Sequence, residues 1–584
     1  MTQHMATVNG LSAYHTSKRP HMPTKSFRQR RNTENYMKKS FANKIKRPLA
    51  LCMAIIILTL CGCAGNQQNA KSTPDASEPT ETPALLAPTP APAPVYGGTL
   101  RLAMPENADT SDPLSVNTKE MLGFFSLIYE SLIVIDQSGV VTPKLAENWS
   151  CDDTGLVWTM KLRSSARWQD TGANVTAADV VYSFERIKQT GGYYSYATDK
   201  VESIAAGSDG SVVVTMKQQG IASLYALNFP IIENPTASTS RYGAGTGPYY
   251  ITSISGDKVT LEINQNWWKE EPYIEKIEFY QRSSNDVSLA SYVAGQLDVV
   301  FTSSLSVGRY REDGVTNVMD VMTQTAEVML FNYGNSELSN PLVRQAIAYA
   351  LNRSAIITNV YMNRARACDV PIAPDSWLYN SRSKVYDYNT ELALSLFDQA
   401  GWKDTDGDGY LEKNAHRYDE LTLKLLVNKS TDSTRETAAG VIASQLEAIG
   451  IHVEIVTAGF TLGDSSSEYA QMLENKDFDI ALVGFNLARD CDILPYIDAS
   501  GAYNYGGYRN DALSALARSL NTARDEAACR EAADALQMSF VEDLPFITLY
   551  FRLSSILYHA SVKGLESERE PDLMSNIANW YIES

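Results

Sequence analysis

The segment that most constrains the fold lies in the last third of the chain, where two strand patterns flank one helical pattern. Residues 421–427 (LTLKLLV) and 451–456 (IHVEIV) are short apolar runs, and residues 434–449 repeat apolar side chains at helical spacing before Gly450. Strands joined by one helix pair in parallel through a right-handed crossover. A further apolar strand, DFDIALVGF at 477–485, ends at a polar loop. The sequence therefore predicts an α/β fold whose ligand site lies beyond the carboxyl ends of strands.

The first 62 residues predict export. Residues 49–60 (LALCMAIIILTL) are almost wholly apolar and follow five basic residues between positions 38 and 47. A spanning helix needs about 20 apolar residues, so this segment is too short to span and fits a cleaved signal peptide. We assign the signal peptide to residues 37–62, starting at Met37. We expect residues 1–36 to be a misannotated extension and exclude them from the fold.

The end of this signal resembles the lipobox of bacterial lipoproteins. Leu60, Gly62 and Cys63 occupy the positions that the lipobox gives to leucine, a small residue and the lipidated cysteine. We therefore expect lipid attachment at Cys63; a plain signal peptide with incidental cysteines is the alternative. Residues 63–95 then form a tether, because residues 64–95 hold seven prolines among small polar residues and cannot build a core. Fully extended, such a tether reaches on the order of 100 Å.

The composition of the exported part excludes several partners. Residues 1–62 hold 11 of the 50 basic residues and one of the 68 acidic residues, which leaves a net charge of −28 from Cys63 onward. This charge repels nucleic acid and anionic lipid surfaces. About 520 residues exceed one hydrophobic core, so we expect two or three domains. The later cysteines are far apart and have no C-x-x-C spacing, so we expect neither a zinc nor a thioredoxin-like site: Cys151, Cys368, Cys491 and Cys529.

Two helix starts carry capping residues. Thr176, followed by Asp179 three residues later, is a capping-box pattern at the start of a predicted helix. Asn340 and Pro341 are a helix cap and a proline at the first helical position. Residues 99–103 and 156–163 show strand patterns. The first half of the globular part therefore mixes strands and helices as well.

Six segments, taken together and in order, resemble one family. They are VTPKLAENWS (141–150), GTGPYY (245–250), NPLVRQAIAYALNR (340–353), AGWKDTDGDGYLE (400–412), YRNDALSALA (508–517) and LPFITLY (544–550). The chain is similar to the extracytoplasmic solute-binding proteins, family 5, of peptide, oligopeptide and nickel ABC transporters. The resemblance implies a type II periplasmic-binding-protein fold, in which two α/β lobes are joined by a hinge that the chain crosses twice.

The resemblance also implies domain boundaries. Lobe one would comprise residues 96–330 together with 548–584, and an extra α+β subdomain would be inserted in it at about residues 136–235. Lobe two would comprise residues 331–547. The two crossings are expected near residues 327–334 and 544–551.

The same resemblance implies a binding protein and not an enzyme. The lobes would close on a solute and deliver it to an ABC permease. A dipeptide or oligopeptide is the expected solute; a nickel chelate, a sugar or another small molecule is the alternative. A secreted hydrolase is a weaker alternative, because the chain contains no G-x-S-x-G, H-E-x-x-H or P-loop motif. We expect a monomer, anchored to the cell membrane through its lipid, with no cofactor and no nucleic-acid partner.

Charged residues in two places are candidates to hold the ends of a peptide. Relatives place a carboxylate-binding arginine near Arg435, and arginine's planar fork suits a carboxylate; Arg489 is a second candidate. In many peptide-binding relatives, an aspartate after the strand at 477–485 pairs with the ligand amine. Here Ala488 or Arg489 stands near that position, so Asp490 or Asp492 would have to serve. The alternative is that these residues only cap turns or face solvent.

The remaining candidates are polar loop residues and aromatic side chains. The loop after the first strand and the end of the strand at 477–485 should face the cleft between the lobes. Aromatic walls are common in solute sites, although a core role is the alternative for each ring. The candidates are Glu106, Asn107, Asn486, Tyr249, Trp267 and Phe485.

One acidic turn imitates a calcium loop. Residues 404–412 (DTDGDGYLE) place aspartates at positions one, three and five, but the twelfth position holds Ala415 where a bidentate glutamate is expected. We therefore predict a solvated turn and no metal site.

Overall fold

The computed structural model describes residues 93–583, except residues 117, 235–242, 414–419, 430–433 and 567. The predicted extension, the signal peptide, Cys63 and most of the tether lie outside the described residues. No helix among the described residues is both long enough and apolar enough to cross a membrane.

The first part of the chain builds a core around two four-stranded sheets. One sheet has the order β1 (Thr99–Pro105), β10 (Lys276–Arg282), β9 (Lys258–Ile263) and β8 (Tyr249–Ser255), with β1 and β10 parallel. The side chains of β1 alternate between core and surface, as its sequence predicts. The other sheet is antiparallel, in the order β4 (Ala146–Cys151), β5 (Val157–Leu162), β7 (Val212–Met216) and β6 (Val201–Ala206). This second sheet lies within the segment predicted to hold the inserted subdomain.

Helices and short strands complete this part. The capping box at Thr176 is confirmed, because its backbone and hydroxyl both donate to the Asp179 carboxylate at the start of α2. The other elements are α1 (Lys119–Ser126), β2 (Ile133–Ile135), β3 (Val141–Pro143), α2 (Ala177–Thr190), α3 (Tyr196–Lys200), α4 (Asn285–Val293), β18 (Val562–Lys563) and β19 (Tyr581–Ile582).

A seven-stranded sheet organises the rest of the chain. Its order is β11 (Val299–Thr302), β17 (Phe546–His559), β12 (Thr316–Phe331), β16 (Ile480–Asn486), β14 (Thr422–Lys429) and β15 (His452–Gly459), and β13 (Ala365–Ala367) also pairs with β17. Strands β14 and β15 are parallel and are joined through α8 (Thr434–Glu447), so the predicted strand–helix–strand unit is confirmed. Strand β16 joins them in parallel and is buried along most of its length.

Further helices pack on this sheet. Asn340 accepts from the Leu342 backbone at the start of α5, where Pro341 is the first helical residue, as predicted. The helices are α5 (Pro341–Ala350), α6 (Arg353–Asn359), α7 (Thr390–Gln399), α9 (Glu468–Glu474), α10 (Leu494–Ile497), α11 (Asp511–Asn521) and α12 (Glu526–Asp543).

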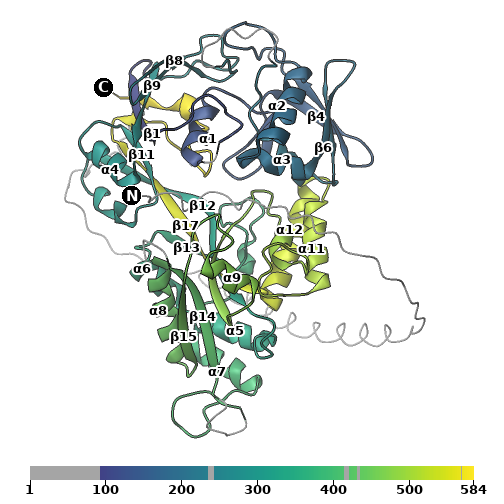
Figure 1. The fold of residues 1–584 in the computed structure, drawn as a ribbon, viewed down its shortest axis with the longest axis vertical. Coiled ribbons are helices and arrows are strands. Elements are labelled where there is room, and N and C mark those ends of the chain that lie inside the picture. Colours follow the sequence, from purple (N-terminus) through teal and green to yellow (C-terminus); the bar gives the residue numbers. More distant parts are fainter. Residues whose placement is uncertain are drawn as a thin grey trace, which may run out of the picture. The chain divides into compact units, whose positions relative to one another are not determined.

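Two long antiparallel strands, β12 and β17, connect two separate hydrophobic cores (Figure 1). Along β12 the core changes between Val321 and Met322, and along β17 it changes between Phe551 and Ile556. We call the parts packed on these cores lobe one, which includes the C-terminal tail, and lobe two. On both strands, the change of core lies a few residues closer to lobe one than the predicted crossing. The apolar runs at residues 327–334 and 544–551, on which the predictions rest, belong largely to the core of lobe two.

The strands are irregular where the cores change. Met322 pairs with Leu553 and Ala326 pairs with Phe551, so residues 323–325 of β12 stand opposite Arg552 alone. The Thr323 hydroxyl donates to the Arg552 backbone oxygen at 2.9 Å. This bond satisfies an acceptor at the point where the regular ladder of backbone hydrogen bonds is interrupted. Such bulges bend a strand locally. The bulge therefore lies where the paired strands pass from one core to the other.

Candidate functional site

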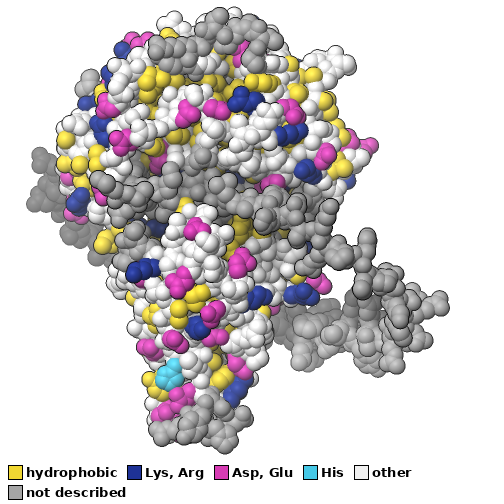
Figure 2. All heavy atoms as spheres, viewed as in Figure 1, with side chains coloured by type: hydrophobic (Ala, Val, Ile, Leu, Met, Phe, Trp, Pro, Cys, Tyr) yellow, Lys and Arg dark blue, Asp and Glu magenta, His cyan; other side chains and the backbone are white. Residues whose placement is uncertain are grey.

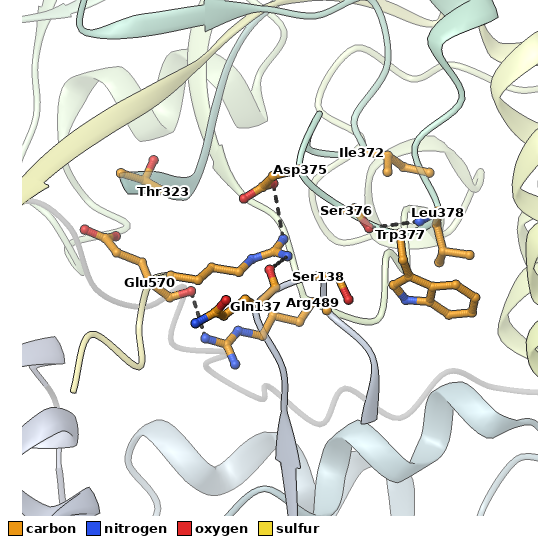
Figure 3. A network of polar contacts seen from close by, with 12 residues as sticks. Gln137, Ser138, Thr323, Ile372, Asp375, Ser376, Trp377, Leu378, Arg489 and Glu570 are labelled. Atoms are coloured by element: carbon orange, nitrogen blue, oxygen red, sulfur yellow. Dashed lines mark hydrogen bonds and ion pairs between the residues drawn. The ribbon is translucent and has the colours of Figure 1, made fainter. Parts of the chain in front are cut away.

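Polar contacts join the two lobes away from the paired strands (Figure 3). In lobe one, Asp136 accepts from the backbones of Ser138 and Val140 and shapes the turn between β2 and β3. The Ser138 oxygen of this turn accepts from the Trp377 backbone of lobe two at 2.9 Å. Arg569, in the C-terminal tail, donates to the Gln137 oxygen and lies 3.5 Å from the Asp375 carboxylate of lobe two.

Arg489, one of the predicted site residues, takes part in these contacts. It lies in the loop after β16, and its Nη2 donates to the backbone oxygen of Glu570 in lobe one at 2.8 Å. Its Nε is buried and has no hydrogen-bond partner in the described part of the chain. The Glu570 carboxylate accepts from Lys119 Nζ at 2.7 Å. A guanidinium with an unused buried donor is therefore present where the lobes meet.

Asp490, the next predicted residue, also faces lobe one. Its carboxylate lies 3.5 Å from Lys200 Nζ, and the Asp492 carboxylate lies 3.0 Å from the same ammonium. Cys491 between them has a left-handed backbone with φ of 58°, and this turn lets both carboxylates reach one cation. Burial raises the pKa of Asp490 above its ordinary value. Burial alone would lower the pKa of Lys200, but attraction to the two carboxylates outweighs it and the pKa is raised.

Arg435 is held inside lobe two. Its Nε and Nη2 donate to both oxygens of Glu327 on β12, at 2.8 and 2.9 Å, and its Nη1 donates to Asn428. Gly484 makes room for this pair, because a Cβ there would lie 2.6 Å from Nη2. Burial would lower the pKa of Arg435, but Glu327 outweighs burial and raises it. Glu327 therefore already occupies the forked side of this guanidinium, formed by Nε and Nη2.

The predicted aromatic walls are mostly core residues. Tyr249 is fully buried and donates to the Ile274 oxygen at 2.8 Å. Phe485 is 4 % exposed and packs against Tyr496 and Phe546. Neither ring presents a surface to a solute in this structure, because alternate residues of buried strands point into the core. Trp267 is partly exposed, and its Nε1 donates to the buried Glu130 at 3.3 Å.

The polar loop candidates remain exposed. Glu106 and Asn107 follow β1, and the Glu106 backbone donates to the Arg282 oxygen at 3.1 Å. Asn486 ends β16 with its side chain exposed. Among the described residues, no hydrogen bond or ion pair joins Glu106 or Asn107 to the loop that holds Arg489 and Asp490. The structure thus brings Arg489 and Asp490 into contact with lobe one. It does not bring them into contact with Glu106 or Asn107 among the described residues.

The acidic turn at 404–412 lies in lobe two. Carboxylate oxygens of Asp404, Asp406 and Glu412 lie within 4.8 Å of one another. Asp404 accepts from the backbones of Gly407 and Gly409, and the buried Glu412 accepts from the Thr405 backbone. These bonds fold the turn back on itself, and we assign no cation to it.

Several residues that meet at the lobe interface carried no local sequence signal. Lys119 and Glu570 are 451 residues apart in the chain, and Lys200 meets Asp492 across 292 residues. A charged residue at the start or end of a helix is ordinarily solvent-exposed, so position alone does not single these lysines out. Only the packing of the tail against α1 shows that the Lys119–Glu570 pair is buried, with 14 % and 10 % of the side chains exposed.

Comparisons with known proteins agree with this architecture. The sequence profile of the bacterial extracellular solute-binding proteins, family 5 Middle, matches residues 140–498. The oligopeptide-binding protein AppA of Bacillus subtilis (strain 168) is 24 % identical over 572 residues, which cover 92 % of this chain and 99 % of AppA.

Solved structures show the same fold. The crystal structure of AppA from Bacillus subtilis in complex with a nonapeptide superposes with a TM-score of 0.58 at 22 % identity, over 84 % of this chain and all of that one. A nickel ABC transporter structure from Bacillus halodurans gives a TM-score of 0.71 at 20 % identity, over 82 % of this chain and 98 % of that one. The predicted type II periplasmic-binding-protein fold is confirmed. The chain belongs to the bacterial extracellular solute-binding proteins of family 5, which are extracytoplasmic binding proteins of ABC transporters and not enzymes.

Proposed function

We propose that this protein captures dipeptides or oligopeptides between its lobes and delivers them to an ABC permease. The similarity to the oligopeptide-binding protein AppA over 99 % of that protein's length carries the proposal. A peptide presents a carboxylate, an amine and backbone donors and acceptors, and the lobe interface offers charged groups of both signs. Arg489 with its unused Nε suits a carboxylate, and Asp490 suits an amine.

The hinge explains how binding is signalled. A solute that contacts both lobes favours the closed arrangement only by the difference in its affinity for the closed and open forms. Rotation about the bulge at residues 323–325 changes the separation of Arg489 from lobe one without unfolding either core. The permease would then distinguish loaded protein from empty protein by shape, and the solute would leave unchanged.

Within this proposal, some of the predicted site residues are stronger candidates for contact with the solute than others. Arg489, Asp490 and Asn486 line the lobe-two side, and Glu106 and Asn107 face solvent at the end of β1 in lobe one. Trp267 is a weaker candidate because its indole is held by Glu130. We leave Tyr249, Phe485 and Arg435 out of the proposed site because their side chains are already packed or paired.

We further propose that Cys63 carries lipid and that the protein is a monomer on the outer side of the membrane. The lipobox-like residues 60–63 and the proline-rich stretch that follows support this proposal. Cys63→Ser should release the protein from the membrane fraction into the medium or periplasm. Retention of this variant in the membrane fraction would contradict lipid attachment at this residue.

Binding measurements on the purified full chain test the solute. We expect native mass spectrometry and calorimetry to show saturable binding of peptides from a panel of two to nine residues, with the peptides recovered intact. Similarity to the nickel ABC transporter protein of Bacillus halodurans supports a second candidate, a nickel chelate. The panel therefore includes a nickel–histidine complex; binding of this complex without binding of any peptide would overturn the peptide proposal.

A further inference from the structure

The pair of Lys119 and Glu570 is largely buried and lies next to the contact that Arg489 makes with lobe one. Lys119 starts α1 and Glu570 belongs to the tail, and both side chains are largely removed from solvent. Burial lowers the pKa of Lys119, but Glu570 outweighs burial and raises it, while Arg552 acts in the opposite sense. The charge of a second cation, Arg552, therefore also acts on Lys119.

That second cation belongs to a different carboxylate. The Nη1 of Arg552 lies 3.9 Å from Glu327, whose two oxygens already receive Arg435. A third cation, Arg489, approaches from lobe two and binds the backbone of Glu570 rather than its carboxylate. Its Nε stays buried without a partner in the described part of the chain.

Two cations from different elements thus meet at one residue, Glu570. Lys119 comes from α1 and pairs with the Glu570 carboxylate, and Arg489 comes from the loop after β16 and donates to the Glu570 backbone oxygen. The Nε of Arg489 is left without a partner in the described structure, so one donor of this group is unused. The outer surface is different: on the face in Figure 2, lysines and arginines are scattered among acidic residues. In a chain this acidic, such a convergence favours an anion.

We propose that Lys119 and Arg489 form a subsite for a carboxylate of the solute, and that the Glu570 side chain fills it in this structure as an internal stand-in. This inference rests on the proposed function, because it names which group of a peptide is recognised. A solute carboxylate would take over Lys119 and the free Nε of Arg489, and Glu570 would rotate toward solvent. Glu570 would then set selectivity, because every carboxylate ligand has to compete with it.

Three matched peptides separate the sources of the carboxylate. The probes are trialanine, its C-terminal amide, and the amide of Ala-Ala-Glu, each titrated into the full chain by calorimetry. Trialanine tests a terminal carboxylate, the glutamate amide tests a side-chain carboxylate, and trialanine amide has neither. We expect the wild-type protein to prefer at least one carboxylate-bearing peptide over trialanine amide.

The variants test the competition. We expect Glu570→Gln to tighten binding of carboxylate-bearing peptides by about tenfold, the effect of roughly 1.4 kcal/mol, without tightening trialanine amide. Lys119→Met should remove most of the preference, and Lys119→Arg should keep it. Glu566→Gln is the control, because Glu566 is an exposed carboxylate of the same tail. Thermal unfolding verifies that each variant folds, and Glu570→Gln should gain more thermal stability from trialanine than the wild type does.

The outcomes are distinguishable. If peptides bind but all three bind alike in the wild type, and Glu570→Gln and Lys119→Met leave their ratios unchanged, the subsite is wrong while the proposed function stands. If no peptide binds any variant and the nickel–histidine complex does, the proposed function fails and the subsite fails with it.

Discussion

Two buried glutamates, Glu327 and Glu570, both pair with cations, but they differ in the number of their partners and in the lobe that supplies them. Glu327 receives two nitrogens of Arg435 in a fork, and both residues belong to lobe two. Glu570 receives one ammonium from its own lobe, while lobe two holds only its backbone oxygen. An ionised carboxylate can accept about four hydrogen bonds, so the first is far better satisfied than the second. We infer that pairs within a lobe stabilise the fold, and that pairs at the interface can exchange partners.

Breaking the pair within lobe two should have the largest effect. Arg435→Met leaves Glu327, with 3 % of its side chain exposed, without its bidentate partner. Loss of one partner of a buried ion pair costs about 3–5 kcal/mol, and we expect that decrease in the free energy of urea unfolding. The double variant with Glu327→Gln should recover most of it. Unchanged stability together with lost peptide affinity would instead make Arg435 the ligand residue that the sequence predicts.

A third buried carboxylate, Glu568, extends the comparison, because no ion pair joins it to a cation among the described residues. Burial raises its pKa to about 8, although Trp580 donates to one of its oxygens; the other oxygen has no partner in the described structure. Between pH 4.5, its ordinary pKa, and pH 8, the unfolded chain ionises this group and the folded chain does not. Its contribution to stability is therefore complete below pH 4.5 and is lost as the pH rises to about 8.

The variant Glu568→Gln isolates this effect. Glutamine stays neutral, so the stability of the wild type relative to this variant should fall with rising pH by on the order of a few kcal/mol. Urea unfolding of both proteins at pH 4.5, 6 and 8 measures the difference. A difference that does not change with pH would show that Glu568 is ionised in the folded protein.

The shared lysine at the interface should show a smaller, conformational effect. Lys200→Met leaves Asp490 and Asp492 close together without the ammonium between them. Because 32 % of the lysine side chain is exposed, solvent weakens the pair, and we expect a shift of about 1 kcal/mol toward separated lobes. Small-angle scattering of the solute-free protein should show a larger radius of gyration. Lys161→Met, which removes an exposed lysine of lobe one, serves as the control; equal radii in all three proteins would contradict the prediction.

Local patterns were enough to predict the elements, but not the interface. Period-two alternation predicts β1, and the apolar repeat between two strand runs predicts β14, α8 and β15, because these signals are read within a few residues. Site residues depend on contacts between distant segments. Phe485 and Arg489 lie four residues apart, yet one packs into the core and the other reaches lobe one. From the sequence alone both residues are predicted to lie near the site. No local pattern distinguishes the residue that faces the site from the residue that packs into the core.

The smallest expected effect comes from a pair with the same geometry as Lys119 and Glu570. Lys188 and Glu185 on α2 also lie 2.7 Å apart, but 38 % and 52 % of their side chains are exposed. Lys188 also lies over the Phe184 ring, so it keeps a contact when the carboxylate is removed. Glu185→Gln should therefore cost less than about 0.5 kcal/mol in urea unfolding, whereas Glu570→Gln, which strands a buried lysine, should cost more. Equal costs would mean that the distance between the charges, rather than their removal from solvent, sets the strength of these pairs.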